Sequence, residues 1–169
     1  MKFVRSFLFL LFLCGSQGRA ITAEPFTVAL PSDFSGPFAS SFGSTRIFTY
    51  VRPTHDPDFR TLFIVTLSPI LESEKNDVLA ARLEHLLRAM SGRLKNFKKA
   101  EVTPCVFAGQ EGLCVNWEGD SRGRAIKGRI LCTARADNFV YLTLQDLSED
   151  WDKNLPDLEK ATSTFALRK

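Results

Sequence analysis

The chain has 169 residues, of which 44% are hydrophobic and 24% are charged, with 22 basic against 19 acidic side chains. This length is typical of one domain with a sizeable core, and it excludes a small scaffold that needs a metal or several disulfides to fold. Three of the basic residues, Lys2, Arg5 and Arg19, lie within the first twenty residues, so residues 21–169 are formally neutral. Nucleic-acid binding, which needs a basic surface, is therefore not indicated.

The N-terminus has the composition of a secretory signal peptide. Two basic residues precede the apolar run of residues 7–14, and a polar segment rich in small residues follows. The run is eight residues long, whereas a bilayer span needs about twenty. We therefore expect a signal peptide over residues 1–20, cleaved after Ala20 or alternatively after Ala23. The mature chain is then periplasmic or extracellular and has no membrane span.

Cys14 gives the same segment a second interpretation, as the lipid-bearing cysteine of a bacterial lipoprotein. The peptidase that exposes such a cysteine needs Gly or Ala before it, and here that residue is Leu13. A soluble exported chain is the preferred interpretation, and an envelope protein anchored through Cys14 is the alternative.

The first part of the mature chain predicts three strands. Residues 26–31 alternate like a strand, a second strand is predicted at residues 45–52, and a third at residues 61–67 contains an apolar run without alternation. Such a run is typical of a strand that is covered on both faces. Two segments rich in Gly, Pro, Ser and Asp, at residues 35–43 and 53–58, are expected to be loops.

The clearest helix is predicted between residues 79 and 97. Apolar side chains recur there at steps of three and four, which places them on one stripe of a helix. They are Leu79, Leu83, Leu86, Leu87, Met90, Leu94 and Phe97. We expect this stripe to pack on the sheet.

Four further strands follow, connected by short turns rich in glycine and polar residues. They are predicted at residues 100–108, 113–118, 124–135 and 139–144. Short turns favour antiparallel hairpins between neighbours. A last helix is predicted at residues 155–161, with Pro156 in its first turn. The order β-β-β-α-β-β-β-β-α predicts an α+β fold in which helices sandwich an antiparallel sheet.

Two short motifs flank these elements: Phe-Thr-Val-Ala-Leu-Pro-Ser-Asp-Phe at residues 26–34 and Ser-Thr-Phe-Ala-Leu at residues 163–167. Together with the order of the elements, they resemble the PsbP-like superfamily, which includes the photosystem extrinsic protein and bacterial envelope proteins such as DcrB. The resemblance spans residues 26–167. It implies a compact binding or accessory domain and carries over no catalytic residues, because the family shares none.

Three cysteines remain after the signal peptide, so at most one intrachain disulfide can form. With a two-residue turn at residues 109–110, Cys105 lies directly opposite Cys114, and the two can bond. With a three-residue turn at residues 110–112, they lie on opposite faces, and a bond between Cys114 and Cys132 is the alternative. Three buried free thiols are the remaining interpretation.

The sequence offers little catalytic chemistry. Residues 119–123 superficially resemble the serine loop of trypsin-like proteases, but Arg122 stands where that loop has glycine, and a hairpin turn is the preferred interpretation. The two histidines, His55 and His85, are expected in a turn and in the long helix. Residues 149–152 are acidic but lack the glycine and final glutamate of a calcium loop. No motif predicts another metal or a cofactor.

Two groups of residues are candidates for binding a partner. Phe38 and Phe42 lie in a segment of small residues, where they either reach the core or meet a partner. In the predicted strand 45–52, two arginines and two aromatic residues share one face. They are Arg46, Phe48, Tyr50 and Arg52. These side chains form either a surface that accepts an anionic or aromatic ligand or a buried face beneath a helix.

These observations predict an exported, non-enzymatic binding or accessory domain of the bacterial cell envelope, with an envelope protein as its partner and no cofactor. The alternatives are a small secreted hydrolase that uses Ser121 or a pair of carboxylates, and the lipid-anchored protein described above. A deep pocket with convergent titratable residues favours the hydrolase, whereas a shallow, aromatic, convex patch favours the binding domain. The sequence contains no signal for the oligomeric state.

Overall fold

The structure is a computed structural model, and it describes residues 24–70, 79–135 and 137–168. The predicted signal peptide, with Cys14 and both expected cleavage sites, lies outside the described residues. Within the described ranges, no helix is long and apolar enough to cross a membrane.

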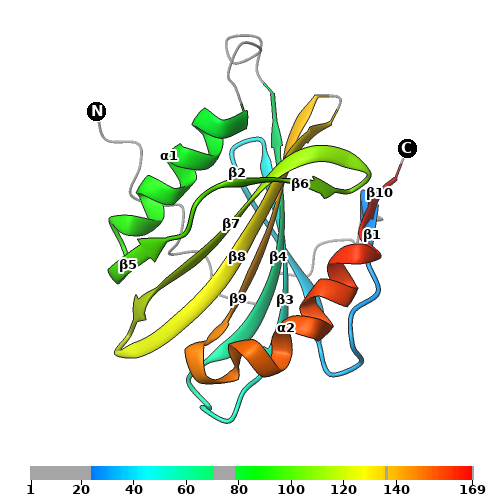
Figure 1. Cartoon of the computed structure of the whole chain (residues 1–169). Helices are drawn as coiled ribbons and strands as arrows, with labels where there is room; N and C mark the ends of the chain where they lie inside the picture. Colours follow the sequence, from blue (N-terminus) through cyan, green and yellow to red (C-terminus); the bar gives the residue numbers. More distant parts are fainter. Residues whose placement is uncertain (1–23, 71–78, 136, 169) are drawn as a thin grey trace.

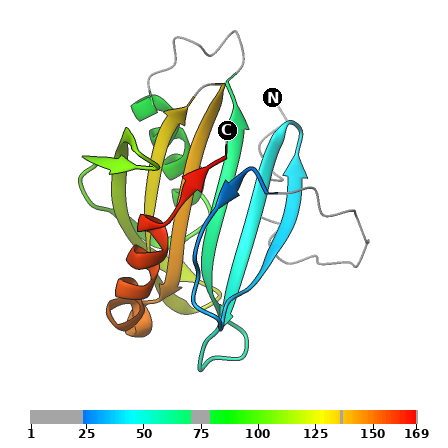
Figure 2. The same ribbon diagram turned by 90° about the vertical axis from the view of Figure 1, so that its right-hand side faces the viewer.

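An antiparallel sheet of eight strands forms the centre of the fold (Figure 1). Seven of the strands lie in the order β2-β3-β4-β9-β8-β7-β5, and β6 pairs with the first part of β7. The bounds are β2 Ser35–Phe42, β3 Thr45–Pro53, β4 Arg60–Pro69, β5 Lys95–Lys99, β6 Thr103–Phe107, β7 Gln110–Ser121, β8 Arg124–Arg135 and β9 Asn138–Leu147. A second, two-stranded sheet joins β1 (Phe26–Thr27) to β10 (Ala166–Leu167), so the first and last described strands lie side by side (Figure 2).

The two helices, α1 (Leu79–Ser91) and α2 (Ser148–Ser163), cover opposite faces of the sheet. In β9, Phe139 packs in the cluster that contains the buried residues of α1, whereas its neighbour Val140 packs in the cluster that contains those of α2. Successive side chains of a strand point to opposite faces of a sheet, so the helices lie on opposite sides. The predicted α+β fold, an antiparallel sheet sandwiched by helices, is confirmed.

An aromatic cluster on the α2 side brings the two ends of the domain together. The ring of Phe26 lies 5.1 Å from that of Phe48 and 5.3 Å from that of Phe165, and Phe165 stacks on Phe107 at 5.2 Å. The segments 26–34 and 163–167, which carry the PsbP-like resemblance, therefore contact each other through Phe26 and Phe165 and through the pairing of β1 with β10.

The prediction of a loop at residues 35–43 is wrong, because residues 35–42 form strand β2. The register shifts between Ser35 and Phe38, around Gly36 and Pro37, and from Phe38 onwards β2 pairs regularly with β3. Glycine and proline break the local strand pattern, and the neighbouring strand supplies the pairing that the local sequence does not indicate. The first predicted strand, 26–31, is also shorter than expected, since β1 ends at Thr27.

The long helix is shorter than predicted, because α1 ends at Ser91 and the chain turns into β5. Leu94 and Phe97 nevertheless pack against the same cluster as α1. Their spacing continues the helical pattern in the sequence. In the structure, however, Phe97 contacts the cluster from β5 and Leu94 contacts it from the turn before β5.

The last helix is longer than predicted, because α2 begins at Ser148 and Pro156 lies inside it rather than in its first turn. Glu149 and Asp150 occupy the first turn instead. Carboxylates at that end are favourable because the helix dipole is positive there. The acidic run 149–152 thus lies at the start of a helix that begins seven residues before the predicted position.

Candidate functional site

Phe38 and Phe42 lie on β2 with their side chains at the surface, 44% and 38% exposed. They pair with Thr49 and Thr45 of β3, which places both rings on the face of the sheet opposite to Phe48. That face is the α1 side, but α1 contacts β5, β7 and β8 at the other end of the sheet. The two phenylalanines therefore lie on a rigid strand at a part of the face remote from the helix.

Phe48 and Tyr50 point to the other face and belong to the core, each only 7% exposed. Phe48 packs on Phe26, and Tyr50 packs edge-on against Phe63 at 6.1 Å. The Tyr50 hydroxyl donates to Glu24 at 2.7 Å, and burial together with this carboxylate raises the pKa of Tyr50. Of the two interpretations of this face, the structure selects burial for both aromatic rings.

The two arginines on the same face of β3 have different surroundings. Arg46 is exposed at the start of the strand. Arg52 is buried, with its Nη1 3.4 Å from Asp157 of α2 and 3.8 Å from Asp33, and its guanidinium lies 5.0 Å from the centre of the Phe34 ring. Arg52 thus fastens α2 to the chain before β2. The six candidate residues of the two groups do not form one surface, and of the aromatic ones Phe38 and Phe42 are accessible.

β2 is also an edge of the sheet. Among the residues that the structure describes, its one neighbouring strand is β3. Its sequence, Ser-Gly-Pro-Phe-Ala-Ser-Ser-Phe, contains no charged residue. An uncharged edge strand that carries exposed aromatic rings is a typical site for contact with another polypeptide. We call residues 38–42 the β2 surface.

The disulfide between Cys105 and Cys114, one of the predicted alternatives, is present in the structure, with a Cα–Cα distance of 5.9 Å. Neither expected turn occurs, because the two-residue turn is Ala108 and Gly109, both with positive φ. Cys105 therefore pairs with Gly112 and bonds diagonally to Cys114 on the same face of the hairpin.

Cys132 is a free thiol and is fully buried. Burial raises the pKa of Cys132 to about 11. The thiol is therefore protonated and inaccessible at neutral pH, which makes it a part of the core rather than a reactive group.

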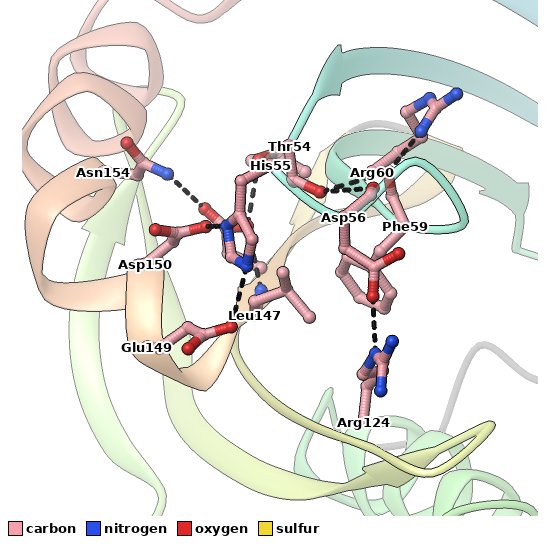
Figure 3. A network of polar contacts seen from close by, with 12 residues as sticks. Thr54, His55, Asp56, Phe59, Arg60, Arg124, Leu147, Glu149, Asp150 and Asn154 are labelled. Atoms are coloured by element: carbon pink, nitrogen blue, oxygen red, sulfur yellow. Dashed lines mark hydrogen bonds and ion pairs between the residues drawn. The ribbon is translucent and has the colours of Figure 1, made fainter.

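A network of polar contacts ties the loop after β3 to the start of α2 (Figure 3). The His55 ring lies between two carboxylates, with Nε2 3.0 Å from Glu149 and Nδ1 3.0 Å from Asp150. Both ring nitrogens therefore contact carboxylates of the first turn of α2. His55 thus contacts α2, whereas Ser121 pairs with Arg124 in the hairpin between β7 and β8.

Two further carboxylates are satisfied within the same network. Buried Asp146 accepts hydrogen bonds from the Thr61 hydroxyl at 2.9 Å and the Asn154 amide at 2.6 Å. Asp56 accepts a hydrogen bond from Arg124, and this contact lowers the pKa of Asp56. These carboxylates hold α2, the β3–β4 loop and β8 together, so the described geometry assigns them a structural role.

A hollow of about 340 Å³ lies between α2 and the β5 end of the sheet. Four of its five charged lining residues pair with each other, Lys98 with Glu118 at 3.2 Å and Lys127 with Asp152 at 4.0 Å, and Lys99 pairs with Glu84. The hollow is open and its charged groups are already paired, so it lacks the free convergent groups of a typical small-molecule site. The β2 surface is therefore the better candidate.

No protein-family model and no curated protein matches the sequence. Solved structures do match. LpqN, a protein involved in cell envelope biogenesis of Mycobacterium tuberculosis, is 12% identical over 85% of this chain and 83% of its own, with a TM-score of 0.59. PA94, a protein of unknown function from Pseudomonas aeruginosa, is 18% identical over 86% of this chain and 99% of its own, also with a TM-score of 0.59.

The PsbP protein of the cyanobacterium Synechocystis sp. PCC 6803 matches as well, at 12% identity over 91% of this chain and 98% of its own, with a TM-score of 0.48. The chain shares the α+β fold of LpqN and PA94, in agreement with the predicted fold class. At such low identities, likeness shows the fold and leaves function to the chain's own residues.

Phe38 and Phe42 were predicted as candidates from the sequence, but the strand that carries them and its position at the edge were not. Gly43 and Ser44 separate residues 38–42 from the next strand, and a two-residue Gly-Ser turn is a known hairpin signal. That signal could have located β2. The edge position could not be found in this way, because it depends on the order of all the strands in the sheet.

Proposed function

We propose that the protein is an exported, non-enzymatic accessory domain of the bacterial cell envelope that binds a protein partner through the β2 surface. The observation that carries the proposal is the exposure of Phe38 and Phe42 on an uncharged edge strand. Aromatic rings held on a strand lose little conformational freedom on binding and offer a large apolar contact. The surface is an exposed strand with two aromatic rings rather than a deep pocket, which favours binding of a protein.

Export is supported by two independent features. The N-terminal segment has the basic, apolar and small-residue order of a signal peptide. The Cys105–Cys114 disulfide is typical of proteins in an oxidising compartment. We propose cleavage after Ala20, a single domain over residues 21–169, and a periplasmic or extracellular location. The fold shared with LpqN, which is involved in cell envelope biogenesis, is compatible with this location.

Capture of the partner tests the proposed surface. The exported protein serves as bait for the envelope and secreted fractions of its own cells, beside a Phe38→Ser variant and a Val106→Ser control. Val106 is a matched control because it is 76% exposed on a different edge strand, β6. We expect a partner that wild type and Val106→Ser retain and that Phe38→Ser loses. Equal capture by all three baits would overturn the β2 assignment, provided that circular dichroism shows the variants folded.

The mass of the exported protein tests the proposed processing. A chain that begins at residue 21 supports cleavage after Ala20, whereas a chain that begins at residue 24 moves the site to Ala23. A mass increased by acyl chains on Cys14 would contradict the soluble form and establish the lipid-anchored alternative.

A further inference from the structure

The two edges of the sheet differ sharply in charge. β5 carries Lys95, Lys98 and Lys99 in five residues and contains a register shift against β7. Lysines and bulges on an edge strand prevent it from pairing with another chain. Beside β5 on the same edge, β6 is short and contains Pro104. β2 has no charged residue in eight positions. One edge is thus protected against pairing with another strand, and the other is not.

The backbone of β2 has a defined set of groups that face away from the sheet. Gly43 and Ser44 form a two-residue turn, and Phe42 pairs with Thr45 across it. The pair that closes such a turn exchanges hydrogen bonds, so the Phe42 backbone faces β3. Because the direction alternates along a strand, the N–H and C=O groups of Ala39 and Ser41 face outward.

These outward-facing backbone groups can pair with the same groups of a second copy. When a second copy is placed antiparallel about a two-fold axis at Ser40, Ala39 lies opposite Ser41 of the second copy and Ser41 lies opposite Ala39 of the second copy. Each of these two pairs exchanges two backbone hydrogen bonds, because all the groups involved face the interface. Pro37, which has no N–H, falls outside the paired residues in this register.

The side chains are complementary in the same register. Phe38 and Phe42 are equally far from Ser40, so each lies opposite the other residue of the second copy. Both are non-hydrogen-bonded pairs, in which side chains approach most closely, and aromatic pairs across strands are stabilising. Because β2 contains no charged residue, no like charges oppose each other across the two strands. The four rings form one aromatic row on the α1 side of the joined sheet.

We propose that two copies of the chain form a symmetric dimer by antiparallel pairing of β2 with β2 about an axis at Ser40. The proposal rests on the proposed function, since it uses the same β2 surface and names a second copy as an occupant of its edge. The interface is isologous and closed. The free edges of the dimer are then the lysine-bearing β5 edges, and the aromatic row remains available on the face for an envelope partner.

Disulfide trapping tests the register. Position 40 lies opposite itself in a non-hydrogen-bonded pair, where the Cα atoms are about 4.5 Å apart and within reach of a disulfide. The two copies of position 41 are offset from each other by two residues along the strands, so their Cα atoms are too far apart for a disulfide. We expect Ser40→Cys to give a covalent dimer under mild oxidation and Ser41→Cys to give none. Cys132 does not interfere, because it is buried. No cross-link at position 40, or equal cross-linking at 40 and 41, would overturn the proposal.

Charge reversal tests the same contact without a covalent bond. In the proposed register Ser40→Lys places the lysine of one copy opposite the lysine of the other, and Ser40→Glu does the same with glutamates. Each variant alone should therefore associate up to about fivefold more weakly than wild type in sedimentation. An equimolar mixture should regain the dimer. A mixture that stays monomeric, while wild type is dimeric, would refute pairing at Ser40, as would a monomeric wild type over the whole concentration series.

The outcomes separate this proposal from the proposed function. A partner lost with Phe38→Ser, without a cross-link at position 40, leaves the binding surface in place and removes the dimer. A cross-link at position 40 without any captured partner supports the dimer and removes the envelope-binding role.

Discussion

Gly128 allows the indole of Trp117 to lie flat on the sheet, and a methyl group there should be strongly destabilising. A Cβ on Gly128 would lie 2.3 Å and 2.4 Å from Cζ2 and Cε2 of Trp117, and 2.5 Å from the backbone oxygen of Leu144. The ring has little freedom to move, because Trp117 is 3% exposed and stacks on Phe97. The carbonyl belongs to the adjacent central strand and cannot retreat.

The expected loss follows from the two ways of relieving this clash. Small shifts in a packed core cost about 1–3 kcal/mol. Expulsion of the indole would expose roughly 200 Å² at about 25 cal/mol per Å², which is about 5 kcal/mol. Since the added Cβ would clash with both the ring and a backbone atom, we expect Gly128→Ala to lower the free energy of unfolding by about 3–5 kcal/mol.

Urea unfolding followed by circular dichroism measures this loss as a lower midpoint with an unchanged slope. Gly92→Ala is the matched control, because its φ is not positive and a Cβ there meets only ordinary contacts at 3.7 Å and 3.8 Å. A Trp117→Leu substitution should rescue part of the defect, since the two sites share one contact. A Gly128→Ala loss no larger than that of Gly92→Ala would refute the reasoning.

Three other predictions concern the cysteines and the acid response. Replacing Cys105 and Cys114 together by serine opens a link between residues nine apart and should lower the free energy of unfolding by about 2.5 kcal/mol in the chain-entropy model; dithiothreitol should lower the wild-type urea midpoint similarly and leave the double variant unchanged. The pKa of Asp56 is lowered by Arg124, so this carboxylate stabilises the fold above its ordinary pKa of 3.8, and the contribution is lost as pH falls through the lowered value. Asp56→Asn should therefore flatten the decline of stability in acid, and an unchanged profile of urea midpoint against pH would contradict this. The Cys132 thiol, fully buried and with its pKa raised to about 11, should resist thiol reagents at pH 8 until the protein is unfolded in urea; rapid labelling of the native protein would show the burial to be wrong.

The sequence predicted the central strands well because burial on both faces leaves a strong local pattern. Residues 124–135, expected as a strand, are β8, and the apolar run 61–67 lies within β4. The first part of the helix stripe is α1. In these elements the local pattern and the tertiary contacts agree, so the pattern alone locates the element.

The sequence could not locate the turn between β6 and β7, because several positions there suit a turn. The structure uses Ala108 and Gly109, and the alanine adopts a φ of 53° that is uncommon for a residue with a side chain. Moving a two-residue turn by one position changes the register by two residues, so Cys105 and Cys114 still share a face. The Cys105–Cys114 pairing was therefore predicted correctly for a register that the protein does not adopt.

The candidate site could be predicted only in part. The exposed rings of Phe38 and Phe42 are conspicuous among small residues, and the sequence analysis named them. Phe48 and Tyr50 instead pack in the cluster that also contains Phe26 and the buried residues of α2. Which face of a strand is covered depends on contacts between residues far apart in the chain, and these do not appear in a local pattern.

Photo-cross-linking in exporting cells tests the central claim most directly. A photoreactive phenylalanine analogue at position 38 replaces a ring of similar shape in its native place, and the same analogue at position 106 on β6 is the control. The account predicts protein adducts from position 38, containing an envelope protein, and none of the same adducts from position 106. No adduct from position 38, or the same adducts from both positions, would contradict the claim that β2 is the binding surface.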